Sequence, residues 1–215
     1  MHPATPLEPV ILTDGPVRLE PLAAVHVDGL MRAGAEPSIW TYLPEVRYRT
    51  RSDFERLVAE ADRDRRAGLS LPFAIVRSEK GVDAVVGTTR YMDIRLRDRG
   101  LEIGWTFLDP AHQRTDVNTR CKRLLLGHAF ERLGMIRVQL KTDLRNIRSQ
   151  RAIERLGARR EGVLRQHMIC ADGHIRDTVY FSVIAKEWPL VREGLDRRLA
   201  RSPPPPVDTA LPLSP

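Results

Sequence analysis

The chain has 215 residues, of which 42% are hydrophobic and 29% charged, a composition typical of a globular domain that buries its own core. These values exclude collagen-like, mucin-like and wholly disordered chains. The 35 Lys and Arg against 28 Asp and Glu give a net charge of +7, which favours an anionic partner such as a nucleotide-like cofactor, nucleic acid or acidic substrate without choosing among them.

Hydrophobic periodicity divides the first half of the chain into strands and helices. In chain order it predicts a strand, two helices and three strands, at residues 17–22, 23–35, 52–67, 71–77, 84–93 and 100–108. Ser52 and Glu55 form a capping box that opens the second helix, and Gly68 ends it. Residues 1–15 carry three prolines and no periodicity, so we expect an extended lead-in there.

The second half of the chain continues the alternation. It predicts a helix, a strand, a helix, two strands and a helix, at residues 118–133, 135–142, 149–156, 159–168, 175–185 and 187–199. Residues 171–173 are the expected turn of a hairpin, and the proline-rich residues 201–215 are predicted to form a disordered tail. Residues 16–200 are therefore expected to be one α/β domain, a mixed sheet with helices on both faces.

Several kinds of site are not expected. Cys121 and Cys170 form no Cys-x-x-Cys pair, and the six histidines form no metal-binding motif, so neither a disulfide framework nor a metal is predicted. No segment approaches the ~20 apolar residues that span a bilayer. The first residues lack the basic and apolar regions of a signal peptide, so we expect a cytoplasmic protein without a membrane partner.

The segment from residue 101 to residue 119 combines features of an anion-binding site. A predicted strand leads through a short polar turn into a helix, an arrangement that presents consecutive backbone N–H groups and the positive end of the helix dipole. Four cations cluster around this turn in the sequence: Arg114, Arg120, Lys122 and Arg123. The pattern predicts a phosphate site, and the alternative is an ordinary capped helix with a solvated basic face.

The same loop resembles that of a known family. Gln113–Asn118 resembles the Q/R-x-x-G-x-G/A acyl-CoA loop of the GNAT (Gcn5-related) N-acetyltransferases. With Lys122, Arg114–Thr119 resembles the R-T-x-V-N-T-x-x-K variant found in the branch that contains the ribosomal-protein N-terminal acetyltransferases. Further segments resemble that branch in order and spacing, so that the resemblance covers roughly residues 16–195: Glu102–Trp105, Asn146–Gly157 and Arg176–Trp188.

The resemblance implies a fold and an activity. The fold would be GNAT-like, with a mixed, mostly antiparallel central sheet, a splayed strand pair and helices on both faces. The activity would transfer an acetyl group from acetyl-CoA to a primary amine, of a protein N-terminus or a small molecule, by direct attack in a ternary complex without a metal. The pantetheine arm of acetyl-CoA would pair with the backbone of Thr106, Phe107 and Leu108 and contact Asn146. Its pyrophosphate would bind the loop residues Gln113, Arg114, Thr115, Asp116, Val117, Asn118 and Thr119.

Two loop residues depart from the family pattern. Asp116 and Asn118 stand where the family has glycines, which are favoured where φ is positive. Asp and Asn are the next-best residues for a left-handed backbone, so the turn is still expected. The Asp116 carboxylate would repel a diphosphate unless its side chain points away. The alternative function is therefore an acyl-CoA-binding module with weak or no turnover.

The candidate catalytic residues each have a structural alternative. Glu102, beside the expected gap, is the candidate general base. Its alternative role is structural, as a carboxylate paired with an arginine such as Arg90. Ser149 is the candidate acid for the departing thiolate, with Tyr180 as a competitor that is otherwise a core residue. Asn146 and Ser149 are equally suited to capping a helix.

The acceptor amine is not identified by the sequence. We expect four residues to line the acceptor pocket: Trp40, Tyr42, Arg90 and Trp105. For the aromatic residues, the alternative is core packing. The arginine-rich surface lacks a recognition motif or interleaved aromatic residues, so nucleic acid is not an expected partner. The last two strands could pair across a two-fold axis in a homodimer.

Overall fold

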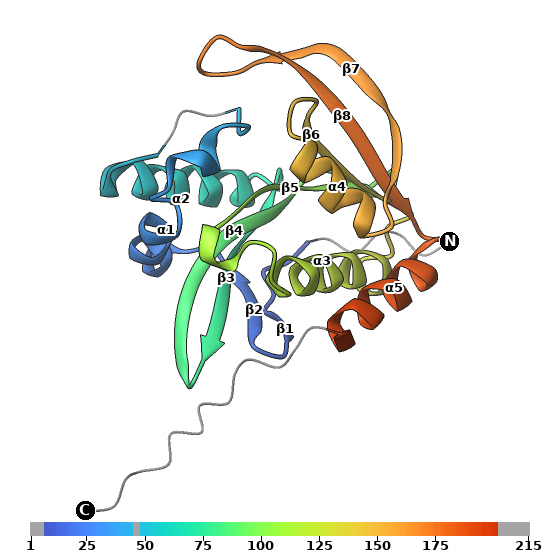
Figure 1. Cartoon of the computed structure of the whole chain (residues 1–215), viewed down its shortest axis with the longest axis horizontal. Helices are drawn as coiled ribbons and strands as arrows, with labels where there is room; N and C mark the ends of the chain where they lie inside the picture. Colours follow the sequence, from blue (N-terminus) through green and yellow to red (C-terminus); the bar gives the residue numbers. More distant parts are fainter. Residues whose placement is uncertain (1–6, 45–47, 202–215) are drawn as a thin grey trace, which may run out of the picture.

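The computed structural model describes residues 7–44 and 48–201 (Figure 1). Within them, eight strands form a single sheet in the order β1-β2-β3-β4-β5-β6-β8-β7. Their bounds are β1 Leu12–Asp14, β2 Val17–Pro21, β3 Leu71–Glu79, β4 Val82–Arg95, β5 Gly100–Leu108, β6 Arg137–Asp143, β7 Arg159–Ile169 and β8 Ile175–Ile184. Neighbours are antiparallel except β5 and β6, which are parallel, so the sheet is mixed and mostly antiparallel as predicted.

Helices cover both faces of this sheet (Figure 1). The α-helices are α1 Val27–Ala33, α2 Arg51–Arg66, α3 Val117–Gly127, α4 Ile147–Arg155 and α5 Trp188–Arg201. Helix α1 packs on β4 and α2 on β3, whereas α3 packs against α5 and against β1 and β2. The predicted fold class is confirmed.

Two apolar clusters fill the space between the helices and the sheet. The larger lies under α3 and α5 and includes Tyr91, Phe181 and Leu125, each fully buried. The smaller lies under α1 and α2 and is built around an aromatic group in which Trp40 makes tilted or edge-on ring contacts with Tyr48, Phe54 and Phe107. Since neighbouring residues of a strand face opposite sides, strands β3, β4 and β5 contribute to both clusters, whereas the apolar residues of β6 and β8 belong to the larger one.

Most predicted elements are present, with differences at their ends. The N-cap of α2 is Thr50 and not Ser52: the Thr50 hydroxyl accepts from the Asp53 amide at 3.2 Å, and Asp53 Oδ2 accepts from the Thr50 amide at 2.9 Å. The predicted lead-in contributes β1, which pairs with β2. Beyond α3 the helix continues as a π turn over His128–Arg132, before the predicted stop at Gly134, whose φ is +65°.

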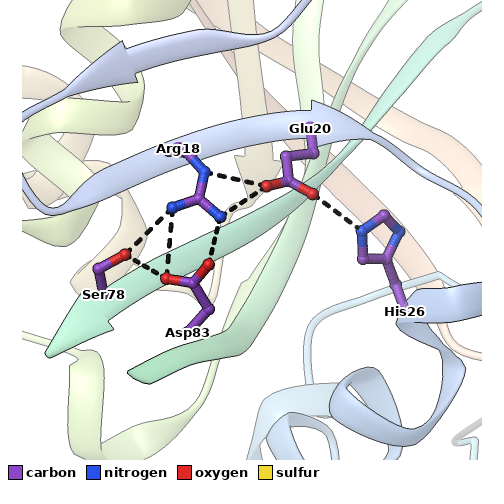
Figure 2. A network of polar contacts seen from close by, with 5 residues as sticks. All are labelled: Arg18, Glu20, His26, Ser78 and Asp83. Carbon is purple, nitrogen blue, oxygen red and sulfur yellow. Dashed lines mark hydrogen bonds and ion pairs between the residues drawn. The ribbon is translucent and has the colours of Figure 1, made fainter. Parts of the chain in front are cut away.

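A polar network fixes the N-terminal half of the sheet (Figure 2). Arg18 on β2 donates to Asp83 Oδ2 at 2.6 Å and to Glu20 Oε1 at 2.9 Å, and Asp83 also bonds Ser78. Glu20 lies 3.3 Å from His26 Nε2, just before α1. The Asp83 and Glu20 carboxylates raise the pKa of Arg18, and the hydrogen bonds from Arg18 and Ser78 lower the pKa of Asp83 to about 2. The network ties β2 to the β3–β4 hairpin and to the start of α1.

Two further expectations concern the proline-rich tail and membrane-spanning segments. The proline-rich tail lies outside the described residues, apart from Arg201 at the end of α5. Among residues 7–44 and 48–201, no helix combines the length and apolar character that a membrane crossing requires.

Candidate functional site

The sheet opens between β5 and β6. The parallel ladder consists of three pairs, Gly100↔Arg137, Leu101↔Val138 and Glu102↔Gln139. Both strands continue, to Leu108 and Asp143, without further pairing to each other in the described part of the chain. From Ile103 onward, the edge of β5 that faces β6 therefore has no partner strand, while its other edge pairs with β4. The predicted splay is confirmed.

A bulge distorts β5 inside this opening. The pairs Thr88↔Phe107 and Arg90↔Gly104 leave one extra residue on β5, and Trp105 there has a φ of +52°. Such a bulge turns backbone groups away from the regular ladder. The strand beside the gap is therefore shaped differently from its neighbours.

Lys122 supports the bulged segment from below. Its ammonium donates to Thr106 Oγ1 at 3.0 Å, and Thr106 Oγ1 lies 2.8 Å from Thr89 Oγ1 on β4. Lys122 is only 5% exposed, and burial lowers its pKa to about 8. A contact from α3 thus holds the segment in place at the cost of burying an amine.

The start of α3 follows β5 after a loop that contains a 3-10 turn at Pro110–His112, and it presents unpaired amides. Thr115 Oγ1 accepts from the Val117 amide at 3.3 Å, and Asp116, the N-cap residue, makes no side-chain cap. Within the described residues, the amides of Asn118 and Thr119 have no hydrogen-bond partner. Free amides at the positive end of a helix dipole are suited to an anion.

The backbone of this loop corrects one prediction. The left-handed residue is Arg114, with a φ of +62°. Asp116 has φ −72° and ψ −15°, and Asn118 lies inside α3. The expectation that these two residues replace glycines in a left-handed turn is wrong, because the helix begins early enough to give both a right-handed conformation.

The Asp116 carboxylate points into an ion-pair network. It accepts from Arg120 Nε at 2.7 Å and from Arg77 Nη1 at 3.4 Å, and Arg120 also contacts Asp14 at 3.0 Å. The side chains of Asp116 and Arg120 are 16% and 18% exposed. The negative charge is therefore compensated by arginines and is not directed at the free amides.

The cations predicted around the loop are mostly used inside the protein. Arg120 is held by Asp116, Arg123 bonds Asp196, and Lys122 is buried against Thr106. Arg114 is exposed, and its side chain has no partner among the described residues. Of the four cations that cluster around this turn, three are therefore bonded to other side chains of the protein.

An arginine that the sequence analysis did not single out joins the loop to α4. Arg148 donates to Gln113 Oε1 at 2.8 Å, and Gln113 Nε2 donates to the Leu108 carbonyl at 3.0 Å. The first turn of α4 is therefore next to the loop before α3. Asn146 caps α4 by accepting from the Ser149 amide at 3.0 Å, which confirms the capping alternative for Asn146.

On the opposite face of the sheet from α3, polar residues gather near the gap. Glu102 is 1% exposed, and its Oε2 lies 3.1 Å from Lys141 Nζ and 3.2 Å from Gln139 Nε2. The expected structural partner was Arg90, which instead lies 4.6 Å over the Trp105 ring and 3.9 Å from Asp64. Glu102 is thus a buried carboxylate held by the neighbouring strand β6.

Tyr180 belongs to this polar face and not to the core. It pairs in register with Lys141, while its neighbours Val179 and Phe181 point into the larger core on the other side. Its hydroxyl lies 3.4 Å from His167 Nε2, and burial raises its pKa. The interpretation of Tyr180 as a core tyrosine is wrong.

Cavities lie on the same face, between α2 and the middle of the sheet. One of about 250 Å³ is lined by Tyr48, Leu57, Glu60, Asp64, Arg90, Met92 and Trp105. A second of about 370 Å³ shares Asp64, Arg90 and Met92 with it. Of the predicted acceptor residues, Arg90 and Trp105 line this space. Trp40 is 5% exposed in the aromatic core, and Tyr42 lies 5.9 Å from the Arg145 guanidinium.

No group of three His, Cys, Asp or Glu side chains that could hold a metal occurs in residues 7–44 and 48–201. The features of the site are instead an open strand edge, free amides, and the buried carboxylate of Glu102 in its ion pair with Lys141.

Comparison with known proteins gives consistent matches. The profile of the acetyltransferase (GNAT) domain family matches residues 17–159. The chain is 33% identical to a GCN5-related N-acetyltransferase from Brucella melitensis, with a TM-score of 0.85 over 93% of this chain and 89% of that one. It shares its fold with Mycobacterium smegmatis RimJ in complex with CoA-disulfide, at 20% identity and a TM-score of 0.75, over 92% of this chain and 97% of that one.

Curated proteins match over a shorter region. The chain is 30% identical over 91 residues to the "Putative ribosomal N-acetyltransferase YdaF" of Bacillus subtilis (strain 168), covering 42% of this chain and 49% of that protein. The chain spans about half the length of the curated relatives it matches. The family profile and the similarity to the Brucella enzyme over nearly the whole chain agree with the splayed strands and the amide-rich loop, and the chain belongs to the GNAT family of N-acetyltransferases.

Proposed function

We propose that this protein transfers an acetyl group from acetyl-CoA to a primary amine, by direct attack of the amine on the thioester in a ternary complex. The observation that carries the proposal is that the β5–β6 ladder ends at Glu102 and that β5 then leads, through a loop, to the free amides at the start of α3. An open strand edge and an anion site on consecutive elements suit the two parts of coenzyme A, its amide-containing arm and its diphosphate.

The donor site uses mostly backbone. The pantetheine arm pairs with β5 at Thr106, Phe107 and Leu108, whose edge towards β6 has no partner strand. The diphosphate lies on the amides of the loop from Gln113 to Thr119, with the exposed guanidinium of Arg114 as its cation. This arrangement is supported by the unpaired amides and by the inward engagement of the Asp116 carboxylate.

The chemical step then follows from placement. The amine nitrogen attacks the thioester carbonyl, the C–S bond breaks, and the thiolate takes up a proton, with proximity supplying much of the rate. Glu102 accepts the proton of the amine, directly or through a water, and Ser149 or Tyr180 protonates the thiolate. The amine enters over the polar face, where Arg90 and Trp105 line the cavity.

The proposal is tested by ligand-induced stabilisation. We expect acetyl-CoA at 100 times its Kd to stabilise the protein by about 2.7 kcal/mol. For a chain of this size that corresponds to a rise in melting temperature of roughly 5–10 °C. A thiol-release assay with a panel of primary amines then tests turnover. A melting temperature that millimolar acetyl-CoA leaves unchanged would contradict the proposal, and binding without release of CoA would favour the module without turnover.

Asp116 provides a second test, because its negative charge in the loop is the reason to consider a CoA-binding module without turnover. In Asp116→Asn, Arg120 keeps Asp14 but loses its nearer carboxylate. We expect CoA to bind about 3–10-fold more tightly, since one negative charge is removed beside the diphosphate. Loss of the partly exposed ion pair should cost about 1 kcal/mol of stability.

Titration calorimetry with CoA measures this change, and Glu79→Gln is the matched control, because Glu79 also pairs with Arg77 at 2.6 Å but is 59% exposed. Weaker binding by Asp116→Asn alone would mean that the carboxylate orients the loop for the ligand. The cytoplasmic location and a homodimer formed through the last two strands, β7 and β8, stay predictions.

A further inference from the structure

Arg176 is a buried cation that forms no ion pair with the part of the chain that the structure describes. It is 4% exposed, and its Nε is inaccessible and has no hydrogen-bond partner. Among the described residues, no carboxylate lies within ion-pair distance of its guanidinium. Burial of an unpaired charge is costly, so such residues are rare unless something else meets the charge.

The nearest acid is already engaged. Asp143 is 1% exposed and accepts from Arg145 Nη2 at 2.8 Å and from the Arg145 amide at 2.8 Å. Burial lowers the pKa of Arg176, whereas the charges of Asp143 and Glu102 act to raise it without overcoming the burial. Arg176 therefore lies in the field of these acids but is bonded to neither.

The position of Arg176 places it on the acceptor side. On β8, Val179, Phe181 and Val183 point into the core under α3 and α5. Because side chains alternate along a strand, Arg176 and Tyr180 lie on the opposite face, which also carries Glu102. The loop that would hold the diphosphate is on the α3 side. A ligand of Arg176 is thus the acceptor and not the donor.

We propose that Arg176 binds a carboxylate of the acceptor, so that the substrate carries a carboxylate in addition to its primary amine. This inference rests on the proposed function, because it takes the polar face as the place where the amine enters. A guanidinium binds a carboxylate through two parallel hydrogen bonds. The nearby charges of Asp143 and Glu102 favour a monoanion over a phosphate dianion.

The register indicates that the two groups of the acceptor are well separated. Arg176 lies four residues from Tyr180 along β8, and Tyr180 pairs with Lys141, the partner of Glu102. Four residues of strand span roughly 13 Å. The amine near Glu102 and the carboxylate near Arg176 therefore require a spacer of several bonds, which excludes the shortest amino acids as the best substrates.

The test compares ω-amino acids, from glycine to 8-aminooctanoate, with alkylamines of the same chain length at saturating acetyl-CoA. We expect the wild-type protein to prefer the acid over the alkylamine at least 10-fold in kcat/KM at an intermediate length. Arg176→Met should abolish this preference and leave the rates with alkylamines within about 3-fold of wild type. Arg176→Lys should keep part of it, because a single cation remains.

Arg165→Met is the matched control, since it removes an exposed arginine from the same hairpin and should keep the preference. Melting temperatures monitor folding, and Arg176→Met is expected to be no less stable than wild type because it removes an unpaired buried charge. Equal rates for acids and alkylamines at every length, a preference unchanged in Arg176→Met, or a stronger preference for phosphoethanolamine would overturn the inference.

Failure of the proposed function is distinguished by equilibrium binding. Calorimetry with the same ω-amino acids needs no acetyl transfer. Binding of the acid but not of the alkylamine, lost in Arg176→Met, supports the anion subsite even if no CoA is released from acetyl-CoA. Turnover of alkylamines without any selective binding of the acids overturns the inference while leaving the proposed acetyl transfer intact.

Discussion

Glu102→Gln is expected to lower kcat about 100-fold or more and to leave the affinity for acetyl-CoA unchanged. Removal of a general base typically costs 10²–10⁴ in rate, whereas the donor site is built from other residues. Glutamine keeps the shape and the hydrogen bond to Gln139 but cannot accept the proton of the amine. Initial rates and calorimetry with acetyl-CoA separate the two effects.

The ion pair of Glu102 calls for a second variant, because its loss alone destabilises the protein. Glu102→Gln leaves Lys141, 20% exposed, without its carboxylate, which should cost no more than about 3 kcal/mol. Lys141→Met breaks the same pair but keeps the carboxylate, so we expect it to retain most of the turnover. If both variants lose stability and turnover in parallel, Glu102 is a structural residue and has no part in proton transfer.

Lys122→Met is expected to make the protein more stable at pH 7 by about 3 kcal/mol. Burial lowers the pKa of Lys122 from 10.5 to about 8, and one pH unit corresponds to about 1.4 kcal/mol. Methionine fills a similar volume without the charge, and Thr106 keeps its contact with Thr89. The same variant should raise the KM for acetyl-CoA, since Lys122 supports the segment proposed to bind pantetheine.

The stability that Lys122→Met gains over wild type should decrease as the pH rises from about 8 to 10.5. Below about pH 8 the amine is charged in both states, so the folded protein bears the full cost of burial. Between about pH 8 and 10.5 the unfolded chain holds more protons than the folded one, and wild-type stability should rise with pH. Urea unfolding at pH 7 and pH 9.5 measures this, with the exposed Lys186→Met as control. Equal differences between Lys122→Met and wild type at the two values would refute a buried charged amine.

Local patterns predicted what depends on neighbours in sequence. The strand at residues 100–108, the polar turn and the following helix were identified because alternation, turn residues and helical spacing are local signals. The α2 cap shows the limit of such signals. Thr50 with Asp53 and Ser52 with Glu55 fit the same rule two residues apart, and only the folded chain shows that the first pair forms the cap.

The charges of the site could not be assigned in this way. Arg120 is held partly by Asp14, which lies 106 residues away in the sequence. Glu102 is held by Lys141 on β6, which lies next to β5 in the sheet, a pairing between strands that local patterns do not detect. One available signal was missed: on β6 the polar residues Gln139, Lys141 and Asp143 alternate with Val138, Leu140 and Thr142, which marks a polar face on a central strand. The roles of the candidate site residues stay predictions.

The short parallel junction between β5 and β6 has a consequence for how such enzymes diversify. Strands β2 to β5 pair in chain order and carry the edge proposed to bind the donor, whereas β6, β8 and β7 form a separate antiparallel group. The two groups share a backbone ladder of only three residue pairs. If the proposed donor and acceptor sites hold, mutations in the β7–β8 hairpin should alter which amine is accepted without disturbing donor recognition. Under the proposed function, the range of acceptors would be free to change during evolution while the use of one common acyl carrier is inherited.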